Sequence, residues 1–89
     1  MATLLVGYDL NKPGQDYSGL IKRLKNVGTT WWHRLDSTWL VKTTMSPSEL
    51  RDDLKNYIDS GDELLVIDVT GAGWAGTGFS NYRWLHDNL

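Results

Sequence analysis

Cysteine is absent from this 89-residue sequence, which excludes disulfides and thiolate metal sites. No apolar run approaches the roughly 20 residues of a membrane-spanning helix, and residues 1–8 lack the features of a secretion signal. We therefore expect a cytoplasmic protein with no membrane partner. Basic residues are not in excess: the net charge is −2. This balance argues against a dedicated nucleic-acid binder, because phosphate contacts need clustered Lys and Arg.

The composition is that of a folded domain, with 40% hydrophobic and 22% charged residues. A chain this short forms one domain and buries only about 60–65% of the surface that its unfolded form exposes. Its core is therefore marginal, and a homodimer is plausible from size alone. Five tryptophans in so few residues are unusual and favour binding to a second copy or to another partner.

Hydrophobic periodicity and turn residues predict six core elements and a tail. Asp16 is the expected cap of the first helix and Gly28 its left-handed C-cap, while Ser46 and Glu49 form a capping box that starts the second helix. Residues 12–14 predict a break in regular secondary structure after the first strand. Strands are predicted at residues 3–8, 29–33, 38–43 and 64–69, helices at 16–28 and 46–60, and a short final helix capped by Ser80.

This order predicts an α+β protein with the ferredoxin-like βαββαβ fold. We expect a four-stranded antiparallel sheet with two helices on one face, formed by residues 1–70. Residues 71–89 form a glycine-rich C-terminal tail with a short helix, which packs on the domain or on a second subunit.

The predicted topology also places the polar residues at the ends of the strands. We expect the first and third strands to lie side by side and parallel. Asp9 would then share a sheet edge with Thr43, with residues 29–31 and with residues 62–63, whereas Asp36 and Asp68 would lie at the opposite edge. Combining Asp9 with Asp36 or His33 in one subunit would require a reach of about 15 Å, the length of a strand.

Three segments carry a family resemblance, namely "GYDL", "HRLDSTWLV" and "LLVID". Over residues 3–70 they resemble the SinR-like small proteins. These are grouped with the CRISPR-associated adaptation nucleases and with virulence-associated protein D. The resemblance implies a ferredoxin-like homodimer and, in several members, a metal-dependent endonuclease acting on RNA or DNA. It further implies that Asp9 lies near its symmetry mate, holds Mg²⁺ and is catalytic, and Mg²⁺ commonly takes only one or two carboxylates.

The sequence also departs from that superfamily. The nucleases have a glutamine-x-serine-aliphatic-aromatic pattern, and "LDSTW" keeps Ser37 and Trp39 but has Leu35 in place of the glutamine. The basic surface is also reduced compared with that of those nucleases. A catalytically inactive homodimeric module that binds a protein partner is therefore the alternative function, and small-nucleotide binding at the same sheet edge is a weaker one. For Asp9 itself, the alternative is a solvated residue that ends a strand.

Candidate nucleic-acid contacts are Lys22, Arg23 and Lys25 on the outward side of the first helix and Trp32 on the second strand. The structural alternatives are a solvated helix face and burial of the tryptophans. Trp31 and Trp32 face opposite sides of a strand, so only one is expected inside. In the tail, "GAGWAGTGF" lacks the lysine of a phosphate loop, and we expect an arm that crosses to a second subunit with Trp74 and Phe79 as anchors. His33, without a neighbouring nucleophile, is expected to be structural.

Overall fold

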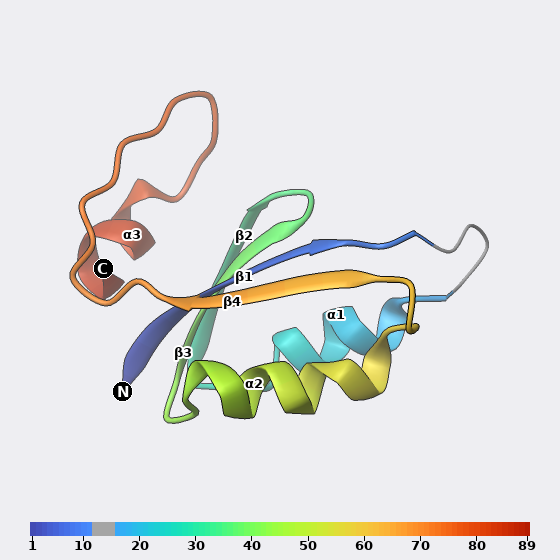
Figure 1. The fold of residues 1–89 in the computed structure, drawn as a ribbon. Helices are drawn as coiled ribbons and strands as arrows, with labels where there is room; N and C mark the ends of the chain where they lie inside the picture. Colours follow the sequence, from blue (N-terminus) through green and yellow to red (C-terminus); the bar gives the residue numbers. More distant parts are fainter. Residues whose placement is uncertain (12–15) are drawn as a thin grey trace.

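The computed structural model describes residues 1–11 and 16–89 as an α+β fold around one four-stranded sheet (Figure 1). The predicted break at residues 12–14 lies outside the described residues. The elements in chain order are β1 (Ala2–Asp9), α1 (Ser18–Leu24), β2 (Thr30–Leu35), β3 (Thr38–Thr43), α2 (Pro47–Leu54), the 3-10 turn η1 (Lys55–Tyr57), β4 (Glu63–Asp68) and α3 (Tyr82–Asn88).

The sheet has the strand order β2-β3-β1-β4, and every neighbouring pair is antiparallel. The predicted antiparallel sheet is confirmed, and the arrangement is compatible with a ferredoxin-like fold. The expectation that the first and third strands run parallel is wrong, because Ala2 pairs with Thr43 and Gly7 with Thr38. The physical reason is the hairpin: β3 reverses the direction of β2, and the crossover through α1 leaves β1 parallel to β2 instead.

One face of the sheet is covered by α1 and α2, which lie side by side beneath it in Figure 1. Leu4 and Val6 point to this face from β1, and Trp39 and Val41 from β3, as the period of two in a strand requires. The helices complete the core with Leu20, Leu24, Leu50 and Leu54, which are all almost fully buried.

The capping box predicted at Ser46 is confirmed. The Ser46 hydroxyl accepts from the Glu49 backbone N–H at 3.2 Å, and the Glu49 carboxylate accepts from the Ser46 N–H at 2.9 Å. The hydrogen bond that the carboxylate accepts from the Ser46 backbone N–H lowers the pKa of Glu49. The helix ends earlier than the predicted residue 60, since η1 follows Leu54 and contains the exposed Tyr57.

The first helix also differs from prediction at its C-terminus. It ends at Leu24, and Gly28 does not have the positive φ of a left-handed cap. Glycine stands there because the β3 backbone passes too close: a Cβ at Gly28 would collide with the carbonyl of Lys42. At the N-terminus Tyr17 occupies the cap position, while the Asp16 carboxylate accepts from the Ser18 N–H at 2.9 Å.

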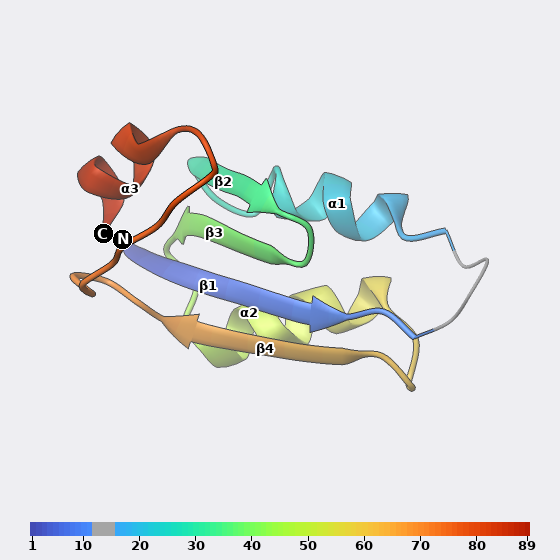
Figure 2. The same ribbon diagram turned by 90° about the horizontal axis from the view of Figure 1, so that it is seen from above.

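The tail returns over the opposite face of the sheet and covers only one end of it (Figure 2). Thr3 anchors both ends of the tail, since its N–H donates to Thr70 Oγ1 at 2.9 Å and its hydroxyl donates to the Asn88 carbonyl. Ser80 does not cap α3: Asn81 holds the cap position in a left-handed conformation, without a side-chain hydrogen bond. A second apolar cluster fills this layer, formed by Trp32, Leu40 and Leu85 with Leu5, Val69, Phe79, Trp84 and Leu89.

Within residues 1–11 and 16–89, no helix is long and apolar enough to cross a membrane.

Candidate functional site

Asp9 is the last residue of β1 and lies directly opposite Glu63, the first residue of β4. Residues directly opposite in an antiparallel pair project to the same face of the sheet. That face is the one away from the helices, because Tyr8, the preceding residue, packs against the helix-side core. Both carboxylates are exposed. Like charges directly opposite each other are unfavourable for a sheet, so stability does not explain this pair.

An open depression of about 390 Å³ adjoins the two carboxylates. Its lining includes the turn between β2 and β3, which lies beside the end of β1: the Tyr8 N–H donates to the Ser37 carbonyl at 3.1 Å. The complete lining is Gly7, Tyr8, Asp9, Ser37, Thr38, Glu63, Leu64 and Leu65.

The placement of Asp36 and His33 corrects the sequence prediction. Both were expected a strand length away from Asp9, yet the antiparallel β1–β3 pairing brings the β2–β3 turn to the Asp9 end of the sheet. His33 nevertheless faces the other way. Its ring stacks on Trp39 at 3.9 Å and its Nε2 lies 3.0 Å from the Asp36 carbonyl, on the helix side. His33 and Asp9 are therefore at one end of the sheet but on opposite faces.

Two other predicted positions are also corrected. Thr43 and residues 29–31 were expected beside Asp9, but Thr43 pairs with Ala2 at the far end of β1. The prediction for residues 62–63 is confirmed by the Asp9–Glu63 pairing, and Asp68 lies at the far end as expected, opposite Leu4.

Asp62, adjacent to Glu63, is occupied by structural hydrogen bonds. Its carboxylate accepts from the Asn11 N–H at 2.7 Å, from the Tyr17 hydroxyl at 2.7 Å and from the Asp59 N–H at 2.8 Å. These contacts join the end of β1 and the start of α1 to the segment before β4. Of the two neighbouring carboxylates, Glu63 is therefore the one that lies opposite Asp9 on the sheet.

Asp9 and Glu63 supply the oxygen ligands that Mg²⁺ prefers, and one or two carboxylates with water commonly suffice for this ion. Among residues 1–11 and 16–89, no group of three or more His, Cys, Asp and Glu side chains is placed to hold a metal. The residues present thus fit a hydrated Mg²⁺ with an incomplete protein shell, and do not fit a fully protein-enclosed ion.

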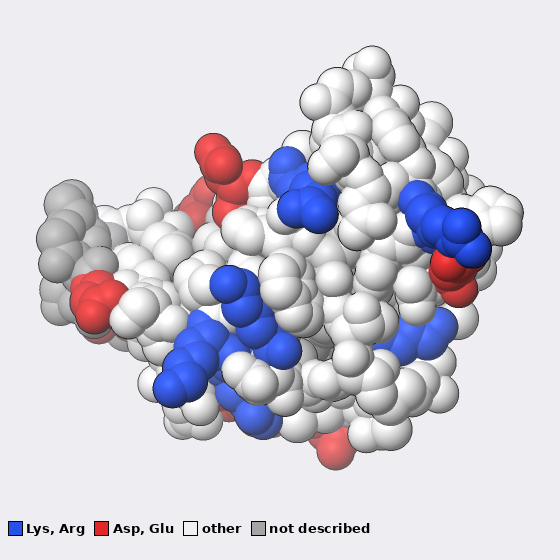
Figure 3. Space-filling model, turned by 180° about the vertical axis from the view of Figure 1, so that it is seen from behind, with Lys and Arg blue, Asp and Glu red and all other residues white. Residues whose placement is uncertain are grey.

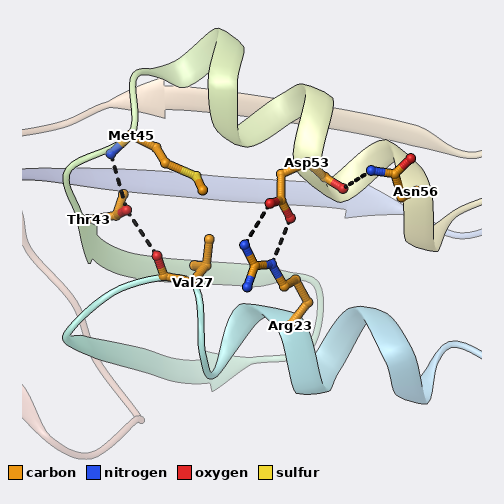
Figure 4. Close-up of polar contacts among 6 residues, drawn as sticks. All are labelled: Arg23, Val27, Thr43, Met45, Asp53 and Asn56. Carbon is orange, nitrogen blue, oxygen red and sulfur yellow. Dashed lines mark hydrogen bonds and ion pairs between the residues drawn. The ribbon is translucent and has the colours of Figure 1, made fainter.

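The predicted basic contacts belong to a different face. Arg23 makes a bidentate ion pair with Asp53 of α2, at 2.8 and 2.7 Å, which lowers the pKa of that carboxyl (Figure 4). The Lys25 ammonium lies 5.3 Å from the centre of the Trp31 ring, and Lys22 is exposed. Figure 3 shows Lys and Arg side chains gathered over the α1 part of the surface. The sheet separates them from the open face that carries Asp9.

Trp32, also predicted to contact nucleic acid, is only 4% exposed and meets Phe79 edge to face at 5.3 Å. Stacking on a base would require the tail to leave the sheet. Trp31 is the exposed member of the pair, at 37%, and packs at 5.3 Å on Trp39. The expectation that only one of the two lies inside is confirmed, because Trp32 is buried on the tail side and Trp31 stays partly exposed on the helix side.

The tail residues predicted to anchor a second subunit pack within their own chain here. Phe79 contacts Trp32, and Trp74 stacks on Tyr82 at 6.1 Å while staying 41% exposed. Packing of the tail on its own domain was one of the two predicted paths. The predicted topology placed residues 62–63 beside Asp9, but that Glu63 is the residue directly opposite depends on the register between strands that are far apart in the chain.

No protein-family model matches the chain, and no solved structure matches it either.

Proposed function

We propose that this chain is a homodimeric protein of the ferredoxin-like fold that binds Mg²⁺ at the Asp9 end of its sheet and cleaves phosphodiester bonds in RNA or DNA. The observation that carries the proposal is the cross-strand pair of exposed carboxylates, Asp9 and Glu63, beside an open depression. The resemblance of "GYDL" and "LDSTW" to the SinR-like and CRISPR-associated proteins supports the same site.

Asp9 and Glu63 would hold the ion, and their mutual repulsion gives a divalent cation a favourable place to bind. When bound, Mg²⁺ polarises a phosphoryl oxygen and stabilises the charge that develops during phosphodiester cleavage. Ser37 is an exposed residue of the lining, and its hydroxyl would donate to a phosphate oxygen bound there. A second Asp9 across a two-fold axis would add a further carboxylate, as the resemblance implies.

The test is cleavage of labelled RNA and DNA, measured with Mg²⁺ and with a chelator. Asp9→Asn and Glu63→Gln should each reduce the rate by more than the 10–100-fold that is typical of losing an outer-shell partner of a metal. Asp52→Asn is the matched control, because Asp52 is an exposed carboxylate on α2 that pairs with the exposed Arg51. Cleavage that survives both site substitutions would contradict the proposal.

Metal binding has its own readout, which separates it from catalysis. We expect Mn²⁺, as a paramagnetic substitute for Mg²⁺, to broaden the NMR signals of residues 9 and 63 before any others. Asp9→Asn should remove this broadening, and Asp52→Asn should leave it unchanged. Unchanged spectra in the presence of Mn²⁺ would exclude a metal role for the pair.

A second candidate function is the catalytically inactive homodimeric interaction module. The observation that favours it is the exposed apolar surface on the open face of the sheet, where Leu65 and Ile67 lie two residues apart on the edge strand β4 and are 58 and 43% exposed. Neighbouring apolar side chains on an open sheet face are typical of contact surfaces. Light scattering should then show a dimer that Ile67→Lys dissociates, with no nucleic-acid cleavage in either protein.

A further inference from the structure

Gly7 lies inside β1 on the open face of the sheet, and the described part of the fold does not require a glycine there. Its φ is not positive, and the pairing of β1 with β3 and with β4 continues through it without a bulge. A Cβ at Gly7 would meet the end of the Leu5 side chain at 3.8 Å, an ordinary contact distance. Gly28 differs, because the Lys42 carbonyl leaves no room for a Cβ there.

A glycine inside a strand needs an explanation, because it has no side chain to pack and loses more conformational entropy on folding than other residues. Strand glycines typically mark a bulge, a sharp bend or the close approach of a ligand or of another backbone. The regular pairing and the open space around Gly7 leave the approach of a ligand. Gly7 also lines the open depression of about 390 Å³ beside Asp9, and its backbone forms the floor.

The side chains around this floor follow from the register of the sheet. Thr38 of β3 and Leu65 of β4 lie directly opposite Gly7 on its two sides, so both project to the open face. Leu65 is 58% exposed, and Thr38 is half-buried. Asp9 is the next residue of β1 on this face, about 6.6 Å further along at a rise of about 3.3 Å per residue. The depression thus has a hydroxyl on one side, an aliphatic side chain on the other and carboxylates at one end.

We propose that this depression binds a nucleotide with its base above Gly7, between Thr38 and Leu65, and with its phosphate at Asp9 and Glu63. The inference rests on the proposed function, because the phosphate is held through the Mg²⁺ that the two carboxylates would bind. The base and the phosphate of one nucleotide are about as far apart as Gly7 and Asp9. A planar ring can lie close to the sheet at Gly7 because no side chain stands there.

The two sides of the depression suit the two kinds of surface that a base presents. The exposed Leu65 side chain covers apolar ring surface that would otherwise face water. The Thr38 hydroxyl both donates and accepts hydrogen bonds, so it can pair with a polar group on the edge of any of the bases. The lining therefore favours a base in general and does not select one of them.

The test compares uridine 5′-monophosphate with ribose 5-phosphate, which has the same sugar and phosphate but no base. Both are titrated in the presence of Mg²⁺, and NMR follows the backbone amide signals of Gly7, Thr38 and Leu65. We expect the nucleotide to shift these signals and to bind about fivefold more tightly, which corresponds to one net hydrogen bond. Equal affinities would mean that the base makes no contact, and would overturn the proposal.

Gly7→Val places a branched side chain over the floor, so both probes should bind with the affinity that ribose 5-phosphate has for the parent protein. Valine favours strands and has room here, and the variant should therefore unfold at the same temperature as the parent or at a higher one. A lower unfolding temperature would show that the fold itself requires the glycine, and would overturn the proposal. Gly61→Ala is the matched control, because Gly61 also has room for a Cβ but lies outside the lining. It should keep the preference for the nucleotide.

Failure of the proposed function would give a different result. Asp9→Asn removes a metal ligand, so it should weaken both probes by the same factor and leave the fivefold preference unchanged. If Mg²⁺ changes the binding of neither probe, the proposed function is wrong and this inference is wrong with it. If Mg²⁺ strengthens the binding of both probes but their affinities are equal, only this inference is wrong.

A second copy of the chain that covers Leu65 is the competing occupant of the depression. The amide signals of Gly7 and Leu65 would then shift with protein concentration in the absence of any probe, and neither probe would bind at concentrations where the dimer forms. That result would also overturn the proposal. Signals that do not depend on protein concentration, together with the preference for the nucleotide, would support it.

Discussion

The indole Nε1 of Trp39 donates a hydrogen bond of 3.1 Å to the hydroxyl of Tyr8. The same hydroxyl lies 3.3 Å from the Asp36 carbonyl, to which it donates. Tyr8 thus connects the fully buried Trp39 of β3 to the turn between β2 and β3. This contact holds the turn against the end of β1, where Asp9 follows directly.

Tyr8→Phe should destabilise the protein by about 1–3 kcal/mol, because the buried Trp39 N–H would lose its acceptor. Urea unfolding followed by tryptophan fluorescence measures the change. Tyr82→Phe is the control, since Tyr82 is exposed and its ring can keep its stacking on Trp74. Equal stabilities of the two variants would show that the Tyr8 hydroxyl is not the acceptor on which Trp39 depends.

Gly28→Ala should cost at least about 2 kcal/mol, because the added Cβ collides with the backbone carbonyl of Lys42, which cannot rotate away. The Thr29 N–H donates to this same carbonyl at 2.9 Å. A movement of the Lys42 carbonyl would therefore also disturb the hydrogen bond of the residue that precedes β2. Gly61→Ala provides the comparison: nothing lies within 4 Å of a Cβ there, and the change should stay below about 0.5 kcal/mol. Thermal unfolding of both variants measures the difference.

The Arg23–Asp53 pair should contribute about 1 kcal/mol at neutral pH, because it is bidentate and only partly exposed. Since the Arg23 hydrogen bond lowers the pKa of Asp53 in the folded state, the contribution is complete above the unfolded pKa of about 3.9 and is lost as pH falls through the folded value.

Asp53→Asn should therefore be less stable than the parent protein at pH 7, and the difference should shrink at pH 3. Urea unfolding of both proteins at the two pH values measures it. Asp52→Asn, which breaks an exposed pair with Arg51, should change stability by less than about 0.5 kcal/mol at either pH. A difference for Asp53→Asn that does not change with pH would contradict this account.

Thr3→Val should loosen the tail. The Thr3 hydroxyl donates to the Asn88 carbonyl, and valine has a similar shape without the donor. We expect the free energy of unfolding to fall by about 1 kcal/mol. Amide hydrogen exchange in α3 should become faster than in the parent protein, and exchange in the sheet strands should change less. Thr44→Val, at an exposed position, is the control. Unchanged exchange in α3 would indicate that the apolar cluster around Leu85 holds the tail without this hydrogen bond.

Local patterns in the sequence were sufficient for the elements themselves. The capping box at Ser46 marks the start of α2 because its hydrogen bonds join residues only three positions apart. The strand at residues 3–8 follows from alternating apolar residues that fit one buried face. Capping by Ser80 and the left-handed cap at Gly28 were wrong, since each conformation depends on what lies nearby in the fold.

Relations between distant segments were decided only in the tertiary structure. The direction of β3 relative to β1 follows from the hairpin and the crossover together, and that direction brings Asp36 and Ser37 to the Asp9 end. The bidentate partner of Arg23 comes from the other helix, and the cover over Trp32 comes from the tail. The sequence alone determined which residues form strands and helices, because those preferences are local. Which carboxylate faces Asp9, and which tryptophan ring lies beneath the tail, depends on register and packing between segments that meet only when the chain is folded.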